Sequence, residues 1–330
     1  MSTPLRVGLV GCGDWGRNHA AALSRLGVLA AVADSRPGLA QEVAGLHGCR
    51  ALNVDELLAD PALQAVVIAA AASDHAALTL QGLMAGKHVF VEKPMALDLA
   101  DARRIRDLAA DRGLTVMTGH ILRFHPAFVA LHAMVRDGVA GRLQRIEGRR
   151  MGYGKFYRDV SVILDLLPHD LALLLALVDR APVSARGRCA RVLTDQADIA
   201  EAELDFGDGL TAGFHVSRVY QGKQRRFAVT GTDATIVFDD QAPWSGKLVV
   251  TRTGQEPQAV AVDEVPPLDA ELGHFIDCIE TGAAPLAGAP QGLAVLKLID
   301  DIPMTWVPVL SGETDVTGET GPARLGVGRP

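Results

Sequence analysis

The chain has 330 residues, of which 48% are hydrophobic and 22% charged, and its formal net charge at pH 7 is −7. A chain of this length and composition has enough apolar residues for two ordinary globular domains. Its acidic balance argues against a nucleic-acid partner, because binding to phosphates requires a basic surface.

The first third of the sequence alternates short apolar runs with amphipathic or Ala-rich segments. Strands are predicted at 5–10, 28–34, 65–71, 88–92 and 114–119, and helices at 15–26, 37–47, 74–85 and 98–112. Strand–helix alternation of this kind forms βαβ units, which build a parallel sheet covered by helices on both faces. The fold class predicted for residues 1–120 is therefore α/β.

After residue 120 the pattern changes. A helix at 126–137, a strand near 143–151 and a long apolar helix ending near 179 are followed by successive strands from 182 to 262 and by helices at 268–281 and about 290–302. This pattern predicts a second, α+β domain over 121–330, with a mostly antiparallel open sheet. The Gly- and Pro-containing tail after about 311 is expected to be loosely ordered.

The cysteines and the N-terminus indicate the compartment. Cys12, Cys49, Cys189 and Cys278 are scattered without metal-ligand spacing, as is typical of a reducing cytosol. The N-terminus runs directly into a strand pattern, so we expect no secretion signal. The most apolar stretch, 162–178, contains Asp, Pro and His and predicts no membrane span. We expect a cytoplasmic protein.

A glycine motif, G-x-G-x-x-G, follows the first predicted strand and opens a helix, as Gly11, Gly13 and Gly16. The first glycine allows a tight turn, the second lets the backbone approach a pyrophosphate, and the third lets helix and strand pack closely. The helix N-terminus then offers N–H groups and a positive dipole to the phosphates. Residues 1–120 are therefore predicted to be a Rossmann dinucleotide-binding domain.

Asp34 bears on the choice of cofactor. It closes the second predicted strand near the spacing expected for a carboxylate that binds the adenosine ribose hydroxyls. Such a carboxylate repels a 2′-phosphate and so favours NAD over NADP, although Arg36 could soften that repulsion. The cofactor-binding residues predicted from this region are Gly11, Cys12, Gly13, Asp14, Trp15, Gly16, Asp34, Ser35 and Arg36.

The apolar strand at 88–92 ends in two charges and a proline, Glu92, Lys93 and Pro94. Burying an unpaired charge is costly, but ligands of an open α/β sheet bind outside the carboxyl ends of its strands. We therefore place Glu92 and Lys93 beside the nicotinamide half of a dinucleotide. An ammonium group there can orient an alcohol and assist proton movement.

A second pair of candidate residues, Asp165 and His169, is spaced as i,i+4 neighbours on a helix, so that both would face one cleft. Pro168 complicates this spacing: the helix either kinks there or begins there, with Asp165 in its lead-in. Imidazole suits proton exchange near neutral pH. Asp170 falls on another face and is interpreted as a packing or capping residue.

The glycine loop, E-K-P and D-x-x-x-H occur in the order found in the glucose–fructose oxidoreductase/inositol dehydrogenase (Gfo/Idh/MocA) family, which the chain resembles over all but its tail. The resemblance implies that Lys93 lies beside the nicotinamide and the substrate hydroxyl, and that the Lys93–Pro94 bond is cis. It assigns general acid/base catalysis to His169, and Asp165 would orient the histidine or bind substrate. Glu92 would be the ion partner of Lys93 or hold the nicotinamide ribose.

Further candidate residues follow from position or resemblance. Near the cofactor we expect Ala71, Ser73 and His75, with a structural use of His75 almost as well supported. His120 and Arg123 could reach the nicotinamide or substrate. Lys155 and Tyr157, with Arg158, favour an anionic substrate if they face the cleft. No metal is predicted, because hydride transfer to NAD requires none.

The sequence therefore predicts an NAD-dependent oxidoreductase that transfers a hydride between the nicotinamide and a secondary alcohol of a sugar, cyclitol or sugar nucleotide. Two alternatives stay open: a reductase of ketosugars or cyclic ketones, and an NAD-binding regulator without turnover. Residues 158–165 lack the glycine cluster that many family members carry just before D-x-x-x-H, so the substrate is not named by the resemblance. The open sheet of the second domain predicts a homodimer or homotetramer.

Overall fold

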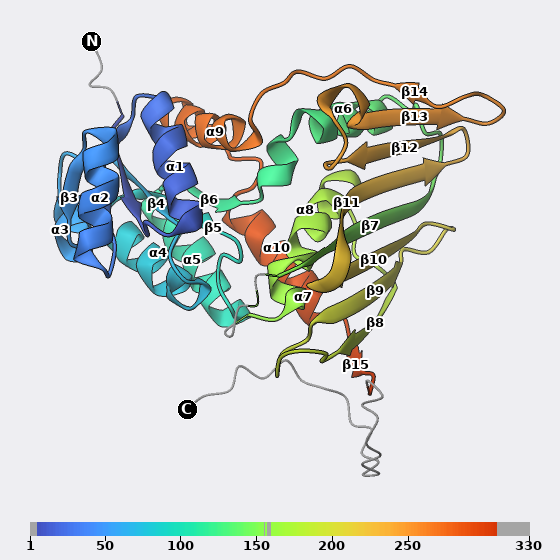
Figure 1. The fold of residues 1–330 in the computed structure, drawn as a ribbon, viewed down its shortest axis with the longest axis horizontal. Coiled ribbons are helices and arrows are strands. Elements are labelled where there is room, and N and C mark those ends of the chain that lie inside the picture. The colour runs from blue at the N-terminus through green and yellow to red at the C-terminus, as the bar shows by residue number, and fades with distance from the viewer. Residues whose placement is uncertain (1–4, 155, 157–159, 309–330) are drawn as a thin grey trace. The chain divides into compact units, whose positions relative to one another are not determined.

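The computed structural model describes residues 5–154, 156 and 160–308. The chain divides into two units (Figure 1): unit 1 is Met1–His125 with Val265–Leu296, and unit 2 is Pro126–Glu264 with Lys297–Pro330. The sequence predicted a single boundary near residue 120 and assigned everything after it to the second domain. In the structure, residues 265–296 instead return to unit 1.

Unit 1 is built on a six-stranded parallel sheet in the order β3-β2-β1-β4-β5-β6. Its strands are β1 (Val7–Val10), β2 (Leu29–Ala33), β3 (Arg50–Leu52), β4 (Ala65–Ile68), β5 (His88–Glu92) and β6 (Val116–Gly119). Every residue of β1, β4 and β6 is buried, as expected for strands covered on both faces. The predicted parallel α/β sheet is confirmed.

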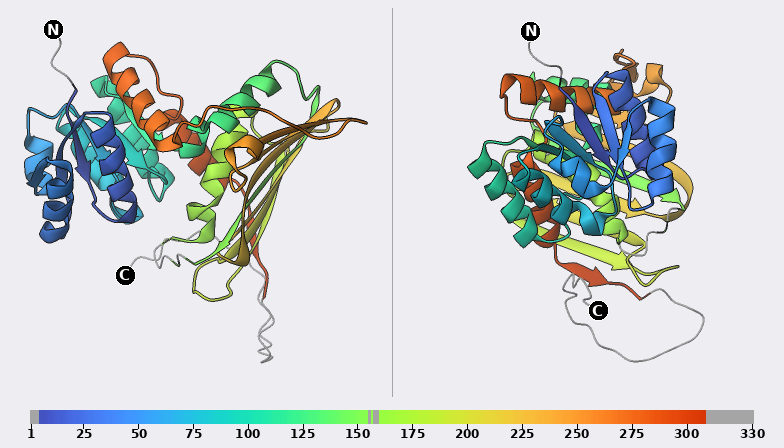
Figure 2. Two further views of the ribbon diagram at one scale, coloured as in Figure 1. Left: turned by 45° about the horizontal axis from the view of Figure 1, so that its top comes forward. Right: turned by 90° about the vertical axis from the view of Figure 1, so that its left-hand side faces the viewer.

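Helices cover both faces of this sheet (Figure 2). They are α1 (Asp14–Arg25), α2 (Pro37–His47), α3 (Val54–Ala59), α4 (His75–Met84), α5 (Leu99–Arg112), α9 (Pro267–Thr281) and α10 (Ala289–Asp300), which crosses the unit boundary. Local signals fix several helix ends: Asn53 and Glu56 form a capping box at α3, and Gly113 ends α5 in the left-handed conformation. Helix α9 adds Leu268, Leu272 and Phe275 to the core that Phe90 of β5 also joins.

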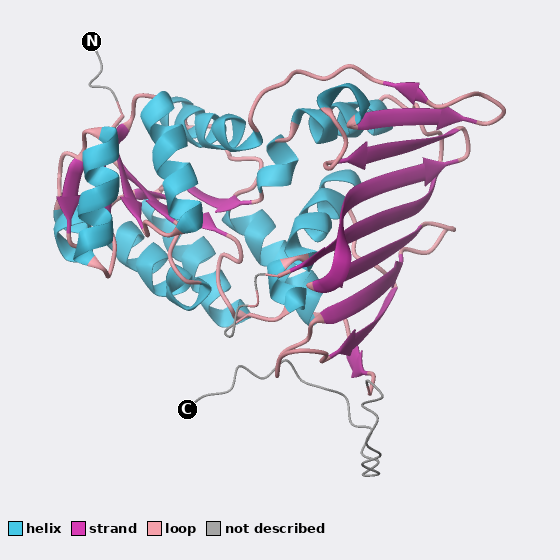
Figure 3. Ribbon diagram, viewed as in Figure 1, coloured by secondary structure: helices cyan, strands magenta, loops and turns pink. Residues whose placement is uncertain are grey.

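Unit 2 contains a nine-stranded sheet in the order β14-β13-β12-β11-β7-β10-β9-β8-β15. The strands of this sheet are drawn in magenta in Figure 3. Its strands are β7 (Leu143–Tyr153), β8 (Ser184–Ala190), β9 (Ile199–Asp205), β10 (Thr211–Ser217), β11 (Val219–Gly231), β12 (Ala234–Asp239), β13 (Leu248–Arg252), β14 (Gln258–Ala259) and β15 (Met304–Trp306). All neighbouring pairs are antiparallel except β10 with β7 and β15 with β8. The prediction of a mostly antiparallel sheet is confirmed.

The helices of unit 2 lie on one face of this sheet (Figure 2). They are α6 (Pro126–Arg136), α7 (Val162–Asp165) and α8 (Leu167–Leu177). Burial alternates along β7 and β9, so every second side chain faces these helices and the others point away from them. One face of the sheet therefore stays open within the unit. In the described part of the chain no helix has the length and apolar character needed to span a membrane.

Candidate active site

The glycine loop between β1 and α1 has the backbone geometry of a phosphate-binding turn. Gly11 has a φ of +97°, and a Cβ placed there would lie 2.4 Å from the Ala69 carbonyl oxygen. A Cβ on Gly16 would lie 2.0 Å from the Gly11 oxygen, so only glycine lets α1 approach the loop this closely. Around Gly13 no atom lies within 4 Å of an added Cβ, and no side chain caps the first turn of α1. The loop therefore has room and N–H donors for a pyrophosphate.

Asp34 follows β2 and joins it to the glycine loop. Its carboxylate accepts hydrogen bonds from the Cys12 backbone N–H at 2.8 Å and from the backbone and side chain of Arg36 at 2.9 and 3.1 Å. Burial opposes ionisation, but these hydrogen bonds outweigh it and lower the pKa of Asp34, so it stays charged. A carboxylate accepts about four hydrogen bonds. One position thus remains for a ribose hydroxyl, and these residues fit NAD.

The other predicted residues of this region differ in accessibility. Asp14, Trp15, Ser35 and Arg36 are exposed around the loop. The Cys12 side chain is buried, and burial together with the nearby Asp34 charge raises its pKa to about 11. Cys12 is therefore an inert thiol that contributes its backbone.

The carboxyl ends of β5 and β6 carry the E-K-P residues. Glu92 is the last residue of β5 and pairs with Gly119 of β6. Lys93 is partly exposed, and the Lys93–Pro94 peptide bond is cis, as expected. His120 follows β6 directly and is 3% exposed. Its pKa falls to about 3, mainly because it is buried and secondly because Arg123 is near, so its imidazole is neutral.

Glu92 points into unit 1. Its carboxylate accepts a hydrogen bond from Trp15 Nε1 at 2.5 Å, and its Oε1 lies 2.8 Å from His19 Nε2. Burial opposes its ionisation, yet the His19 and Trp15 contacts lower the pKa of Glu92. Glu271 of α9 is fully buried nearby, and neither of its oxygens has a hydrogen-bond partner in the described structure. Burial and the Glu92 charge raise the pKa of Glu271 far above its ordinary value of 4.5.

Behind the E-K-P turn lies His75, the first residue of α4. It is 2% exposed, and its ring nitrogens lie 2.8 Å from the Pro94 carbonyl oxygen and 3.2 Å from that of Ala70. These contacts favour the structural reading of His75, as an anchor of the turn that follows Lys93. Ala71 and Ser73, in the same connection, are exposed.

Unit 2 carries the second pair of predicted residues. Asp165 is the last residue of α7, and α8 begins at Leu167 with Pro168 in its first turn. The proline therefore starts a helix, which was the second of the two readings of this segment. His169 lies in the same first turn and is half-buried. Lys155 and Tyr157 lie outside the described residues.

A buried ion pair anchors the start of α8. Asp170 accepts a hydrogen bond from Arg150 of β7 at 2.8 Å, and both side chains are nearly inaccessible. Burial raises the pKa of Asp170 despite this pairing. Arg225 of β11 lies close enough to interact electrostatically with Asp170 and Asp165. Asp170, the residue next to His169, is thus held by an ion pair to β7, a contact that the predicted packing or capping role did not include.

Family models match both units. Residues 5–120 match an oxidoreductase family with an NAD-binding Rossmann fold, and residues 128–237 match the GFO/IDH/MocA C-terminal domain. The chain belongs to the Gfo/Idh/MocA oxidoreductase family. Its first domain is accordingly an NAD-binding Rossmann domain, and the protein is an oxidoreductase.

Individual members of the family are similar over most of the chain. UDP-N-acetylglucosamine 3-dehydrogenase of Acidithiobacillus ferrooxidans is 36% identical over 69% of this chain and 72% of its own. A solved structure of that enzyme covers 90% of this chain and 96% of its own at 32% identity, with a TM-score of 0.82. Inositol 2-dehydrogenase of Rhizobium meliloti is 30% identical over 90% of this chain and 95% of its own.

Two residues of this Gfo/Idh/MocA protein that lie near Glu92, His19 and Glu271, were not predicted from the sequence. His19 follows Trp15 by four positions in α1, so a helical wheel places the two on one face, but nothing local points to Glu92 as their partner. Glu271 lies 179 positions after Glu92, and its burial depends on the return of α9 to unit 1. No cluster of three metal-ligating side chains occurs among the described residues.

Proposed function

We propose that the protein is an NAD-dependent dehydrogenase that oxidises a secondary alcohol of a sugar, cyclitol or nucleotide sugar. The observation that carries this proposal is a partly exposed Lys93 at the carboxyl end of β5, in the same unit as a glycine loop that fits a pyrophosphate. The relatives support the substrate class, since two of them are named for oxidation of a nucleotide sugar and of inositol.

In this proposal Lys93 and His169 handle the proton of the reacting hydroxyl. NAD, when bound, accepts the hydride at its nicotinamide ring. Lys93 orients the hydroxyl with its ammonium group, and His169 takes the proton as a general base, a role that contributes about 10²–10⁴-fold in rate. Asp165 orients His169 or the substrate. His120, neutral at pH 7, and Arg123 offer polar groups to the substrate without adding a titrating base.

A screen for NADH formation tests this function. The purified protein is mixed with NAD and with UDP-N-acetylglucosamine, myo-inositol, scyllo-inositol and free hexoses, and absorbance at the NADH band is followed. Turnover of at least one polyol supports the dehydrogenase. NAD binding without turnover in either direction would favour the regulator, and faster consumption of NADH with the corresponding ketones would favour the reductase.

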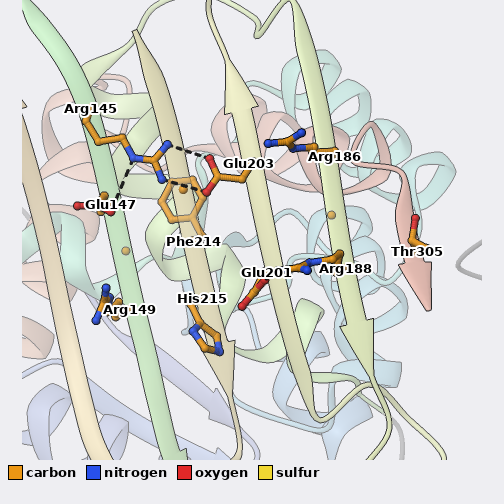
Figure 4. Close-up of a pocket in the computed structure, with 13 residues that line it drawn as sticks. Arg145, Glu147, Arg149, Arg186, Arg188, Glu201, Glu203, Phe214, His215 and Thr305 are labelled. Atoms are coloured by element: carbon orange, nitrogen blue, oxygen red, sulfur yellow. Dashed lines mark hydrogen bonds and ion pairs between the residues drawn. The ribbon is translucent and has the colours of Figure 1, made fainter. Parts of the chain in front are cut away.

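We further propose that the open face of the unit 2 sheet binds a second copy of the chain. This face carries guanidinium and carboxylate groups in neighbouring rows around a hollow of about 710 Å³ (Figure 4). Arg145 binds both oxygens of Glu203 at 2.8 and 3.0 Å, whereas Arg149 and Arg186 form no ion pair among the described residues. A surface with both signs of charge can pair with a copy of itself across a two-fold axis.

Light scattering at micromolar concentration tests the assembly: a homodimer or homotetramer is expected, and a monomeric mass would refute it. Arg186→Glu should weaken the assembly if the sheet face mediates it, whereas Arg103→Glu, on the exposed surface of α5, should not. We also propose a cytoplasmic location, which the four free thiols Cys12, Cys49, Cys189 and Cys278 support.

A further inference from the structure

The Glu92 carboxylate is bound from two directions within unit 1. Its Oε1 meets Trp15 Nε1 at 2.5 Å and His19 Nε2 at 2.8 Å, both from α1. Its Oε2 accepts a hydrogen bond from the backbone N–H of Lys93 at 3.2 Å. The carboxylate thus joins helix α1 to the peptide that carries the Lys93 side chain.

Trp15 lies inside the glycine motif, between Gly13 and Gly16, in the first turn of α1. That turn supplies the N–H groups for the pyrophosphate. His19 is one turn further along α1, and its ring packs edge-on against Trp15 with centroids 5.9 Å apart. One end of the connection is therefore part of the cofactor loop, and the other is the residue before Lys93.

The carboxylate has little freedom to leave this position. Glu92 is 7% exposed, and a Cβ on Gly119 would lie 2.9 Å from its carboxyl carbon, so the group lies against the backbone of β6. His19 Nδ1 is buried without a partner in the described structure. Because a proton on Nδ1 would have no acceptor, the surroundings favour a proton on Nε2, through which His19 donates to Glu92.

We propose that Trp15 and His19 are positioning residues for Lys93, which act through Glu92 and couple occupation of the pyrophosphate site to the placement of the lysine. A dinucleotide that binds the first turn of α1 restrains Trp15, and two hydrogen bonds carry the restraint to Glu92 and its neighbour. The coupling is reciprocal, so a Lys93 held in place also favours the loop conformation that binds phosphates.

ADP-ribose separates this coupling from direct contact, because it has both phosphates and the adenosine of NAD but no nicotinamide. The rate at which an amine reagent modifies Lys93 is measured by mass spectrometry with and without saturating ADP-ribose. The exposed Lys297 serves as internal reference in the same digest. In the parent protein we expect ADP-ribose to change the Lys93 rate by about fivefold or more, the scale of a typical coupling energy.

Trp15→Phe keeps a ring against His19 but removes the N–H donor. The variant is measured at an ADP-ribose concentration that calorimetry shows to saturate the site. The effect of ADP-ribose on the modification rate of Lys93 should then fall below about twofold. His19→Leu should behave in the same way, and His19→Gln, whose amide can still donate to Glu92, should restore most of the response. Trp306→Phe, in β15, is the matched control and should respond like the parent. An equal response in the parent and in Trp15→Phe, or no response in the parent while ADP-ribose binds, would overturn the proposal.

The importance of Lys93 for turnover rests on the proposed function. A second experiment therefore separates the coupling of Trp15 to Lys93 from the role of Lys93 in the reaction. With a substrate from the screen, Trp15→Phe should lower kcat by about tenfold in the parent and have almost no effect in a Lys93→Ala background, because residues that act through one group are not additive. An equal loss in both backgrounds would make Trp15 merely structural. Full activity of Lys93→Ala alone would refute the proposed role of Lys93 and leave the labelling result standing.

Discussion

Replacing Glu271 with glutamine is expected to make the stability of the protein less dependent on pH. Glu271 is fully buried beside the Glu92 charge, and both effects raise its pKa far above 4.5. In the unfolded chain the same carboxyl ionises near its ordinary value. Between these two pKa values the folded state holds a proton that the unfolded state has released, so the free energy of unfolding falls as the pH rises.

The size of the effect follows from proton linkage. One proton contributes about 1.4 kcal/mol for each pH unit through which the folded carboxyl stays protonated and the unfolded one is ionised. Above pH 5 the free energy of unfolding of the parent should therefore fall relative to that of Glu271→Gln, whose amide has a similar shape and does not titrate, and the fall should continue for as long as the folded carboxyl keeps its proton. Well below pH 4.5 the Glu271 carboxyl is protonated in both the folded and the unfolded chain. The difference in the free energy of unfolding between the parent and the variant should then be constant.

Urea unfolding of the parent and the variant at pH 5, 6, 7 and 8 measures this difference. Glu280→Gln, an exposed position on the same helix α9, is the matched control and should run parallel to the parent, because its carboxylate stays in water when the helix folds. If the Glu271→Gln difference stays constant within about 0.5 kcal/mol over this range, Glu271 is ionised in the folded protein and the reasoning fails.

Three further predictions concern the cofactor, the reaction and the anchor of α8. Asp34→Ala should weaken NAD binding and narrow its advantage over NADP, as measured by fluorescence titration, and clearly tighter NADP binding by the parent would contradict the assignment. Lys93→Ala and His169→Ala should each lower turnover by about 10²–10⁴-fold with the fold intact, and the double variant should lose less than the product of the two single losses. If Lys93→Ala unfolds instead, the ammonium group of Lys93 has a structural role. Arg150→Met should destabilise the protein by about 3–5 kcal/mol, because it leaves Asp170 buried without its hydrogen-bonded partner, and adding Asp170→Leu should recover most of the loss in a thermal melt. Equal melting temperatures of the single and double variants would refute this.

The sequence predicted the elements of unit 1 well where the apolar signal is continuous. The run that became β4 is buried throughout, and the run that became β5 is buried in all but its first residue, so neither pattern needs knowledge of the neighbouring strands. β3 and α3 were missed, because a three-residue strand with two exposed side chains and a helix of six residues are too short to show a period.

In the candidate site, too, local motifs could be predicted from the sequence, whereas contacts between distant segments could not. The glycine loop and the E-K-P turn are local motifs, so their residues could be identified from spacing. The contacts of Glu92 with His19, and its neighbour Glu271, depend on packing between segments far apart in the sequence. The structure was also needed to decide the role of Pro168, because spacing alone could not distinguish a kinked helix from the start of a new one.

The return of residues 265–296 to unit 1 has a consequence for synthesis on the ribosome. The core beneath β5 is closed by Leu268, Leu272 and Phe275, which are translated after all the strands of both sheets except β15. A nascent chain that ends at residue 125 therefore has every strand of the nucleotide-binding sheet but exposes the apolar surface that α9 covers. Unit 1 can complete its fold only after unit 2 has almost entirely emerged, and a chaperone that binds exposed apolar segments has that interval in which to act.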